Sequence, residues 1–268
     1  MTDRDIFIEN VKKYNKDNKY NISDFFLYGE ESEFLYIPND DIKKQVHFSV
    51  WDNSMTDLPD GICVFQSSID RSSRKSTQFP MPYPFSKIDE KFELITETPP
   101  SKPSIGFCGF YFVNEIRRDT LYHLKRDKRL NTDFIWRASY QAKSDNISQD
   151  DARIEFIENM RNNAFNVCVR GNGNYSFRFY EALSCGRIPV LLDTDTILPF
   201  DDVIDYSEFC IITNTADELS EAILNKWNDG SYIEMQKKAY EVYYEYFDIN
   251  IVGKRIIEYL DRNYEKKL

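Results

Sequence analysis

The chain has 268 residues, of which 41% are hydrophobic and 29% charged, a balance typical of a folded protein. A single compact core seldom needs that length, so two domains are expected. Lys and Arg number 34 against 45 Asp and Glu, which gives a formal net charge of −11. Because an acidic surface repels a phosphate backbone, we expect no nucleic-acid partner.

The sequence also disfavours a membrane or secreted protein. No apolar run approaches the ~18 residues that a membrane span needs, and the first residues do not resemble a signal peptide. The five cysteines lie among apolar neighbours and form no C-x-x-C pair, as expected of reduced, buried thiols. These features predict a cytoplasmic protein without a membrane span.

The first hundred residues are short apolar runs separated by polar turns, with little helical signal. The strands expected there are residues 25–28, 45–51 and 61–66. Prolines then become dense, in Phe79-Pro-Met-Pro-Tyr-Pro-Phe and in Thr98-Pro-Pro-Ser-Lys-Pro, where neither a helix nor a central strand can continue. We place an interdomain crossing at residues 98–103, which divides the chain into residues 1–100 and 101–268.

After this crossing, strands and helices alternate. The expected strands are residues 104–109, 133–137, 165–170, 187–193 and 209–213, and the expected helices are residues 114–126, 149–162 and 175–185, with a mostly helical remainder from residue 217. Such alternation is typical of a parallel sheet covered on both faces, hence of a Rossmann-like domain. Ligands bind beyond the carboxyl ends of such strands, which singles out residues 106–112, 170–175 and 193–200.

Two stretches of this acidic chain are basic. Residues 161–187 hold four arginines and one acid, and residues 114–130 hold six Lys or Arg and three acids. Both stretches suggest a site for a small anion. A solvated helix face is the alternative interpretation of the second stretch.

Residues 170–181 combine the features of a phosphate site. Gly171 and Gly173 permit a tight turn after a strand, and the helix that follows exposes unpaired N–H groups and partial positive charge. Arg170 and Arg178 add charged, forked donors. The alternative is a glycine turn with nothing bound, because G-x-G alone is weak and the dinucleotide and P-loop spacings are absent.

Two further side chains complete this segment. Ser176 can cap the helix or donate to a phosphate oxygen. Glu181 lies three residues after Arg178, on the same side of the helix. Its carboxylate could accept hydrogen bonds from the two hydroxyls of a ribose, and the simpler alternative is an ion pair with Arg178.

The run R-G-x-G-x-x-S-x-R-x-x-E-A-L-x-x-G-x-I-P-V, from Arg170 to Val190, resembles the signature of the exostosin family. The similarity is close over residues 165–209, looser at residues 105–109 with Arg117 and Arg118, and faint at His47-Phe-Ser-Val-Trp-Asp and at residues 79–84. The family comprises inverting glycosyltransferases of the GT-B type. The resemblance implies an α/β fold with two Rossmann-like domains and a cleft between them, the amino-terminal one small.

The resemblance also assigns roles. Residues 1–100 would form the acceptor-side domain and residues 101–268 the nucleotide-sugar-binding domain, with a last helix that can return to the first. Arg170 and Arg178 would hold the donor diphosphate, Ser176 would assist, and Glu181 would hold the ribose. The full set of expected substrate-binding residues is Arg117, Arg170, Gly171, Gly173, Ser176, Arg178 and Glu181.

The predicted function is inverting transfer of a hexosyl or pentosyl group from a nucleoside-diphosphate sugar, with UDP as the expected nucleotide, to a glycan hydroxyl in polysaccharide biosynthesis. Arg178 would stabilise the departing diphosphate. The alternative is a non-catalytic partner that binds nucleotide sugar or glycan within a glycosyltransferase complex. A Rossmann oxidoreductase is disfavoured, because the glycine motif comes late and has the wrong spacing.

The expected catalytic base is Asp52. Inverting displacement needs a base opposite the leaving group, and Asp52 follows the strand at residues 45–51, at its carboxyl end. The alternative is a turn-forming Asp ahead of Asn53 and Ser54, and His47, in mid-strand, is the second candidate base.

No cofactor and no metal are expected. Asp193 and Asp195 resemble a D-x-D metal motif, but they follow a strand where the exostosin pattern already has an acidic residue. The two histidines, His47 and His123, are far apart in sequence, which does not support a zinc site.

Overall fold

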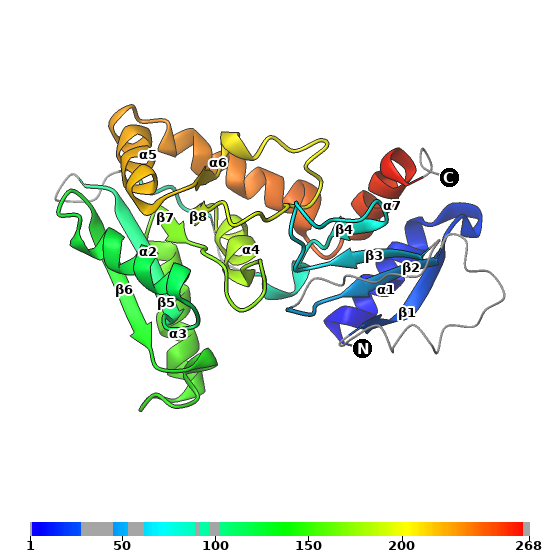
Figure 1. Cartoon of the computed structure of the whole chain (residues 1–268), viewed down its shortest axis with the longest axis horizontal. Coiled ribbons are helices and arrows are strands. Elements are labelled where there is room, and N and C mark those ends of the chain that lie inside the picture. Colours follow the sequence, from blue (N-terminus) through cyan, green and yellow to red (C-terminus); the bar gives the residue numbers. More distant parts are fainter. Residues whose placement is uncertain (1, 28–44, 53–61, 89–91, 97–101, 265–268) are drawn as a thin grey trace.

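A computed structural model of the chain describes residues 2–27, 45–52, 62–88, 92–96 and 102–264, arranged as two α/β halves (Figure 1). The strands are β1 (Asn21–Leu27), β2 (Gln45–Ser49), β3 (Ile62–Gln66), β4 (Gln78–Pro80), β5 (Ser104–Phe110), β6 (Asn131–Arg137), β7 (Phe165–Val167), β8 (Ile188–Leu192) and β9 (Ile211–Thr213). The helices are α1 (Asp3–Tyr14), α2 (Glu115–Arg126), α3 (Gln149–Asn162), α4 (Phe177–Ser184), α5 (Ala216–Asn228), α6 (Tyr232–Val242) and α7 (Val252–Asn263).

The amino-terminal sheet is parallel and has the order β1-β2-β3-β4. One of its faces carries four buried phenylalanines in register, one from each strand: Phe26, Phe48, Phe65 and Phe79. Phe7 of α1 contacts this row at one end, 5.0 Å from Phe48 between ring centroids, and Tyr259 of α7 contacts it at the other, 5.2 Å from Phe79. The last helix thus covers the sheet built by the first residues.

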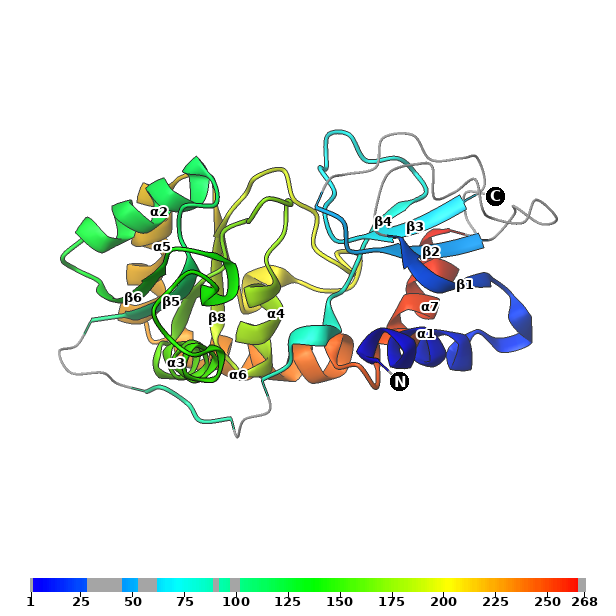
Figure 2. The same cartoon turned by 90° about the horizontal axis from the view of Figure 1, so that it is seen from below.

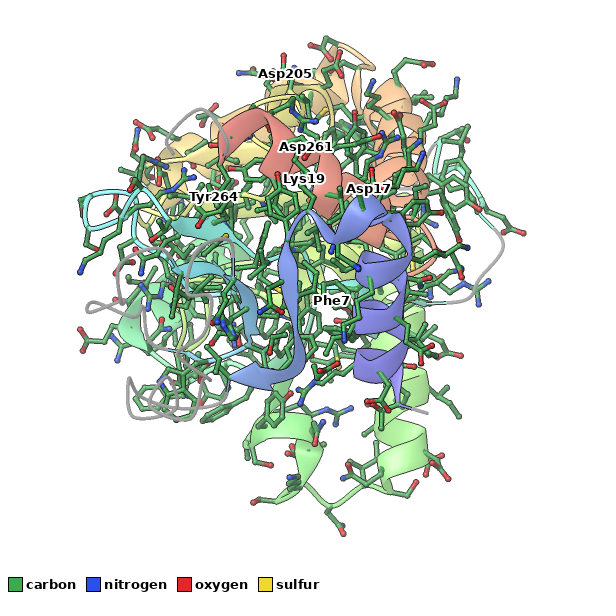
Figure 3. All side chains as sticks on the ribbon, turned by 90° about the vertical axis from the view of Figure 1, so that its right-hand side faces the viewer. Phe7, Asp17, Lys19, Asp205, Asp261 and Tyr264 are labelled. Carbon is green, nitrogen blue, oxygen red and sulfur yellow. The ribbon has the colours of Figure 1, made fainter. Side chains whose placement is uncertain are left out.

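Helix α1 is absent from the prediction. Its apolar face is narrow, with only Phe7, Ile8 and Val11 buried, so its periodicity is weak. Its start is nevertheless marked, because Thr2 and Asp5 form a reciprocal capping box, which satisfies two free N–H groups. Figure 3 looks onto α1 and α7, where Lys19 and Asp261 pair at 2.7 Å between Nζ and Oδ1.

The second sheet is parallel throughout and has the order β6-β5-β7-β8-β9. Helices α2 and α5 cover one face, and α3, α4 and α6 cover the other (Figure 2). The chain passes from β5 to β6 on one side and then returns to β7 on the other side of β5. This reversal of strand order between β5 and β7 is the place where open α/β sheets bind ligands.

The predicted α/β fold, GT-B-like with two Rossmann-like halves, is confirmed by these two parallel sheets. One hydrophobic core joins the phenylalanine row to buried residues of α4 and α7. The strand predicted at residues 165–170 is shorter in the structure, where β7 ends at Val167. Helix α4 ends as predicted, with Gly186 at φ +65°, a conformation that favours glycine. The expected crossing at residues 98–103 lies mostly outside the described residues.

The helices in the described part of the chain include none long and apolar enough to cross a membrane. Residues of both halves line a cavity of about 30 Å³, among them Ser67, Asn174 and Thr194. That volume holds water and not a nucleotide.

Candidate functional site

Arg178 lies at the strand reversal, across the carboxyl end of β5. Its Nη2 donates to the carbonyl of Cys108 at 2.6 Å, and its guanidinium stands 4.3 Å from the ring centroid of Phe107. Gly109 makes this approach possible, because a Cβ there would lie 2.7 Å from Nη2. Arg178, a predicted site residue, is therefore held against β5, where Gly109 leaves room for its guanidinium.

The other donors of the Arg178 guanidinium make no hydrogen bond within the described part of the chain. Its Nε is buried without a hydrogen-bond partner among the described residues, and the only hydrogen bond of its guanidinium there is the one from Nη2. A buried charged donor without a partner costs free energy. An acceptor that reached this Nε would therefore stabilise the arrangement.

Arg117, at the start of α2, lies beside Arg178. Its Nη2 donates to the Val169 carbonyl at 2.9 Å and its Nη1 to the Phe110 carbonyl at 3.1 Å. Burial, and then the charge of Arg178, lower the pKa of Arg117 to about 9. Among the residues that the structure describes, no carboxylate counters this decrease. Arg117 therefore fastens the end of β7 to the end of β5 and adds positive potential; its direct contact with a ligand stays a prediction.

The β7–α4 loop, residues 168–176, is braced from inside and from α2. Asn114 donates to the Gly171 carbonyl at 2.6 Å, and Gly171 N–H donates to the Tyr175 carbonyl at 3.2 Å. Arg170 turns back onto the Asn172 carbonyl at 2.8 Å. Ser176 is the first residue before α4, but its hydroxyl does not cap the helix. Capping, one of the two roles expected for Ser176, is therefore not seen, and donation to a phosphate oxygen stays a prediction.

Glu181 pairs with a residue that the sequence did not single out. Its Oε1 accepts from Nη1 of Arg153 on α3 at 3.2 Å, so the simple Arg178–Glu181 ion pair is replaced. Glu181 is 8% exposed, and burial raises its pKa although Arg153 and Arg178 oppose the rise. Arg153 keeps 47% of its side chain exposed, and an exposed partner is one that a ligand can displace.

Asp52, from the amino-terminal half, lies against the β7–α4 loop. Its Oδ1 accepts from the hydroxyl of Tyr175 at 3.0 Å. Gly173 allows this approach, since a Cβ there would lie 2.5 Å from the Tyr175 ring and 3.0 Å from the Asp52 carbonyl oxygen. Partial burial, and then the charges of Glu181 and Asp52, raise the pKa of Tyr140, which places this ring near both carboxylates.

His47, the second candidate for the base, is packed inside the amino-terminal sheet. It is 4% exposed, and burial lowers its pKa to about 4. A neutral histidine buried in a central strand cannot contact the acceptor substrate. Asp52 is therefore the remaining candidate base, and it reaches the β7–α4 loop.

The acids of the D-x-D sequence hold the two halves together. Asp193 accepts from Arg71 at 3.1 Å, and Asp195 accepts from the backbone N–H and the hydroxyl of Ser72. Beside them, Asn174 is 1% exposed and bonds to Asp70 at 2.7 Å and to the Thr194 carbonyl at 2.8 Å. This junction is a structural contact between loops that follow β3, β7 and β8.

A model of the Exostosin GT47 domain matches residues 34–226 of the chain, which is more than half of its length and contains every predicted site residue. The chain belongs to the exostosin GT47 family. The exostosin-1 homolog of Caenorhabditis elegans is 28% identical over 177 residues, 61% of this chain and 46% of that protein. Exostosin-1 of Drosophila melanogaster is 34% identical over 116 residues, 40% of this chain and 15% of that protein.

This exostosin-family chain thus spans less than half the length of these two curated relatives. Among solved structures it resembles a mutant of S. aureus TarM in complex with fondaparinux, α-GlcNAc-glycerol and UDP. That match has a TM-score of 0.48 and 15% sequence identity, and it covers 80% of this chain and 51% of that one.

Proposed function

We propose that this chain is an inverting glycosyltransferase that moves a sugar from a nucleoside-diphosphate sugar, with UDP as the expected nucleotide, to a hydroxyl of a glycan. One observation carries the proposal: at the reversal of the sheet, the Nε of Arg178 is buried without a hydrogen-bond partner among the described residues, and the charge of Arg178 acts on the neighbouring Arg117. Two neighbouring guanidinium groups, of which Arg178 still has a buried donor without a partner, favour a doubly charged ligand such as a diphosphate.

The other predicted residues fit around a diphosphate held there. Arg170 lies at the start of the β7–α4 loop, and Ser176 lies at its end, at the N-terminus of α4, where the helix adds partial positive charge. Glu181 lies one turn further along α4, and its carboxylate would accept the ribose hydroxyls. The exposed Arg153, which pairs with Glu181 in the free chain, would then be displaced or shared.

The proposed reaction is a direct displacement. The acceptor oxygen forms a bond to the anomeric carbon of the donor sugar, while the bond from that carbon to the phosphate oxygen breaks. The electron pair leaves with the diphosphate, whose charge Arg178 stabilises. The proton of the acceptor hydroxyl passes to Asp52, which comes from the half of the chain opposite the donor site.

Turnover of labelled nucleotide sugars tests the proposal, with Asp52→Asn as the matched variant because it keeps the shape and removes the basicity. We expect the parent to transfer sugar or slowly hydrolyse one donor, and Asp52→Asn to bind that donor equally well with transfer reduced by about 100-fold or more. Transfer by Asp52→Asn at the parental rate would eliminate Asp52. Nucleotide binding without any turnover would favour the non-catalytic partner instead.

A further inference from the structure

We propose that Tyr175 is a positioning residue for Asp52, so that the β7–α4 loop that binds the donor also orients the catalytic base. This inference rests on the proposed function, because it concerns the same displacement. It goes further by making one loop responsible for both ends of the reaction. The sequence did not single out Tyr175, which is separated from Asp52 by 123 positions.

The contact itself is specific to one carboxylate oxygen. The hydroxyl of Tyr175 lies 3.0 Å from Oδ1 of Asp52 and 3.4 Å from the carbonyl of Val50, so its single proton favours the carboxylate. Among the described residues, Oδ2 of Asp52 has no hydrogen-bond partner. One oxygen is therefore held in place, and the other remains available for the acceptor's proton.

The position of the Tyr175 ring is restrained by the contacts of the residues on either side of it. The backbone N–H of Asn174, directly before it, donates to the Ser68 hydroxyl at 2.8 Å, and the Asn174 Oδ1 accepts from the Thr194 hydroxyl at 2.6 Å. Phe177, two residues after it, lies 5.0 Å from the Tyr175 ring and stacks on Tyr83 at 3.9 Å. The hydroxyl is thus aimed from a loop that is fastened to both halves of the chain.

Tyr175 acts as a donor and not as a second base. Burial, and then the charge of Asp52, raise the pKa of its phenol, so the hydroxyl keeps its proton at neutral pH. A neutral donor on Oδ1 fixes the direction in which Oδ2 points. Because the same loop continues into Ser176 and α4, it links the proposed donor site to the base.

Tyr175→Phe tests this role, because it removes only the hydroxyl. We expect kcat to fall by about 10- to 100-fold, with nucleotide affinity and the KM for the donor unchanged. The double variant Tyr175→Phe with Asp52→Asn should be no slower than Asp52→Asn alone, since the hydroxyl acts through that carboxylate. Tyr122→Phe is the control: Tyr122 is 42% exposed on α2, away from Asp52, and its variant should keep the parental kcat.

Two kinetic results would overturn the proposal: a parental kcat in Tyr175→Phe, or full multiplication of the two effects in the double variant. NMR of Cζ-labelled tyrosines tests the contact without turnover. The Cζ resonance of Tyr175, assigned by its loss in Tyr175→Phe, should change its chemical shift at neutral pH in Asp52→Asn, because the hydroxyl then loses its charged acceptor. An unchanged shift would disprove the contact, whereas a changed shift in a chain that turns over no donor would refute the proposed function alone.

Discussion

Two neighbouring loops of the second sheet carry charged residues in opposite states. The β7–α4 loop lies beside Arg178, whose Nε is buried without a hydrogen-bond partner among the described residues, and beside Arg117, whose pKa is lowered by burial and by the charge of Arg178. The loop after β8 carries Asp193 and Asp195, and both bond to residues of the amino-terminal half. Both loops follow buried parallel strands, so position alone does not distinguish them.

The difference lies in hydrogen-bond satisfaction. Charges that are fully paired within the chain stabilise a junction and gain little from a ligand, whereas unpaired donors gain the most from one. Under the proposed function, Arg178 and its surroundings would bind the ligand, whereas Asp193, Asp195 and Asn174 join the two halves.

The largest expected effect is on nucleotide binding. Arg178→Ala should weaken the binding of UDP by about 10- to 100-fold, because a charge-assisted hydrogen bond contributes roughly 1.5–3 kcal/mol. Calorimetric titration measures the affinity, and circular dichroism checks that the fold is retained. Arg71→Ala is the matched control, since that guanidinium already bonds to Asp193 and to the Thr196 carbonyl. Equal losses in the two variants would erase the distinction between the loops.

The second effect is on stability. Asn174→Ala should lower the free energy of unfolding by about 1–3 kcal/mol, because it leaves buried polar groups of both halves without partners. Denaturant titration gives this value, and nucleotide affinity measured on the folded variant should change much less. A variant as stable as the parent would show that the junction contributes little.

A smaller effect is expected at the rim of that junction. Arg71 is 56% exposed in its side chain, and solvent screens its pair with Asp193. Asp193→Asn should therefore cost at most about 1 kcal/mol and leave UDP binding intact. A large loss of nucleotide affinity in Asp193→Asn at every salt concentration would show that Asp193 belongs to the ligand site.

The smallest effect depends on pH. Burial raises the pKa of Glu181, so Glu181 favours the folded state below its unfolded pKa, and this contribution is lost as pH rises through the folded pKa. Glu181→Gln removes the cost of the buried charge. Its Tm relative to the parent should thus be higher at pH 7 than at pH 4, while nucleotide binding weakens. A relative Tm that falls between pH 4 and pH 7 would contradict the assignment.

Most of the second sheet could be predicted from the sequence, because buried parallel strands and their helices leave a local pattern. Helix α3 was predicted at residues 149–162, and it spans Gln149–Asn162. Helix α1 could not be predicted from periodicity, since only three of its residues are buried. Its cap at Thr2 was the available signal.

The candidate site could be predicted only where its residues are close to one another in the sequence. Arg178 and Glu181 share a motif with the glycine turn, and the motif led to both. Tyr175, Arg153 and Tyr140 had no such signal, because their partners lie on other elements: Arg153, for example, meets Glu181 across 28 positions. Contacts of this kind arise from sheet order and from the meeting of the two halves, which a single sequence does not reveal.

Calorimetric titration of the parent chain with uridine, UMP and UDP in excess EDTA tests the central claim most directly. If Arg178 and its neighbours form a diphosphate clamp, affinity should rise from uridine to UMP to UDP and should persist without divalent ions, because the guanidinium groups and the helix N-terminus supply the positive charge. Equal affinity for the three ligands, or UDP binding that appears only with Mg²⁺ or Mn²⁺, would contradict the clamp.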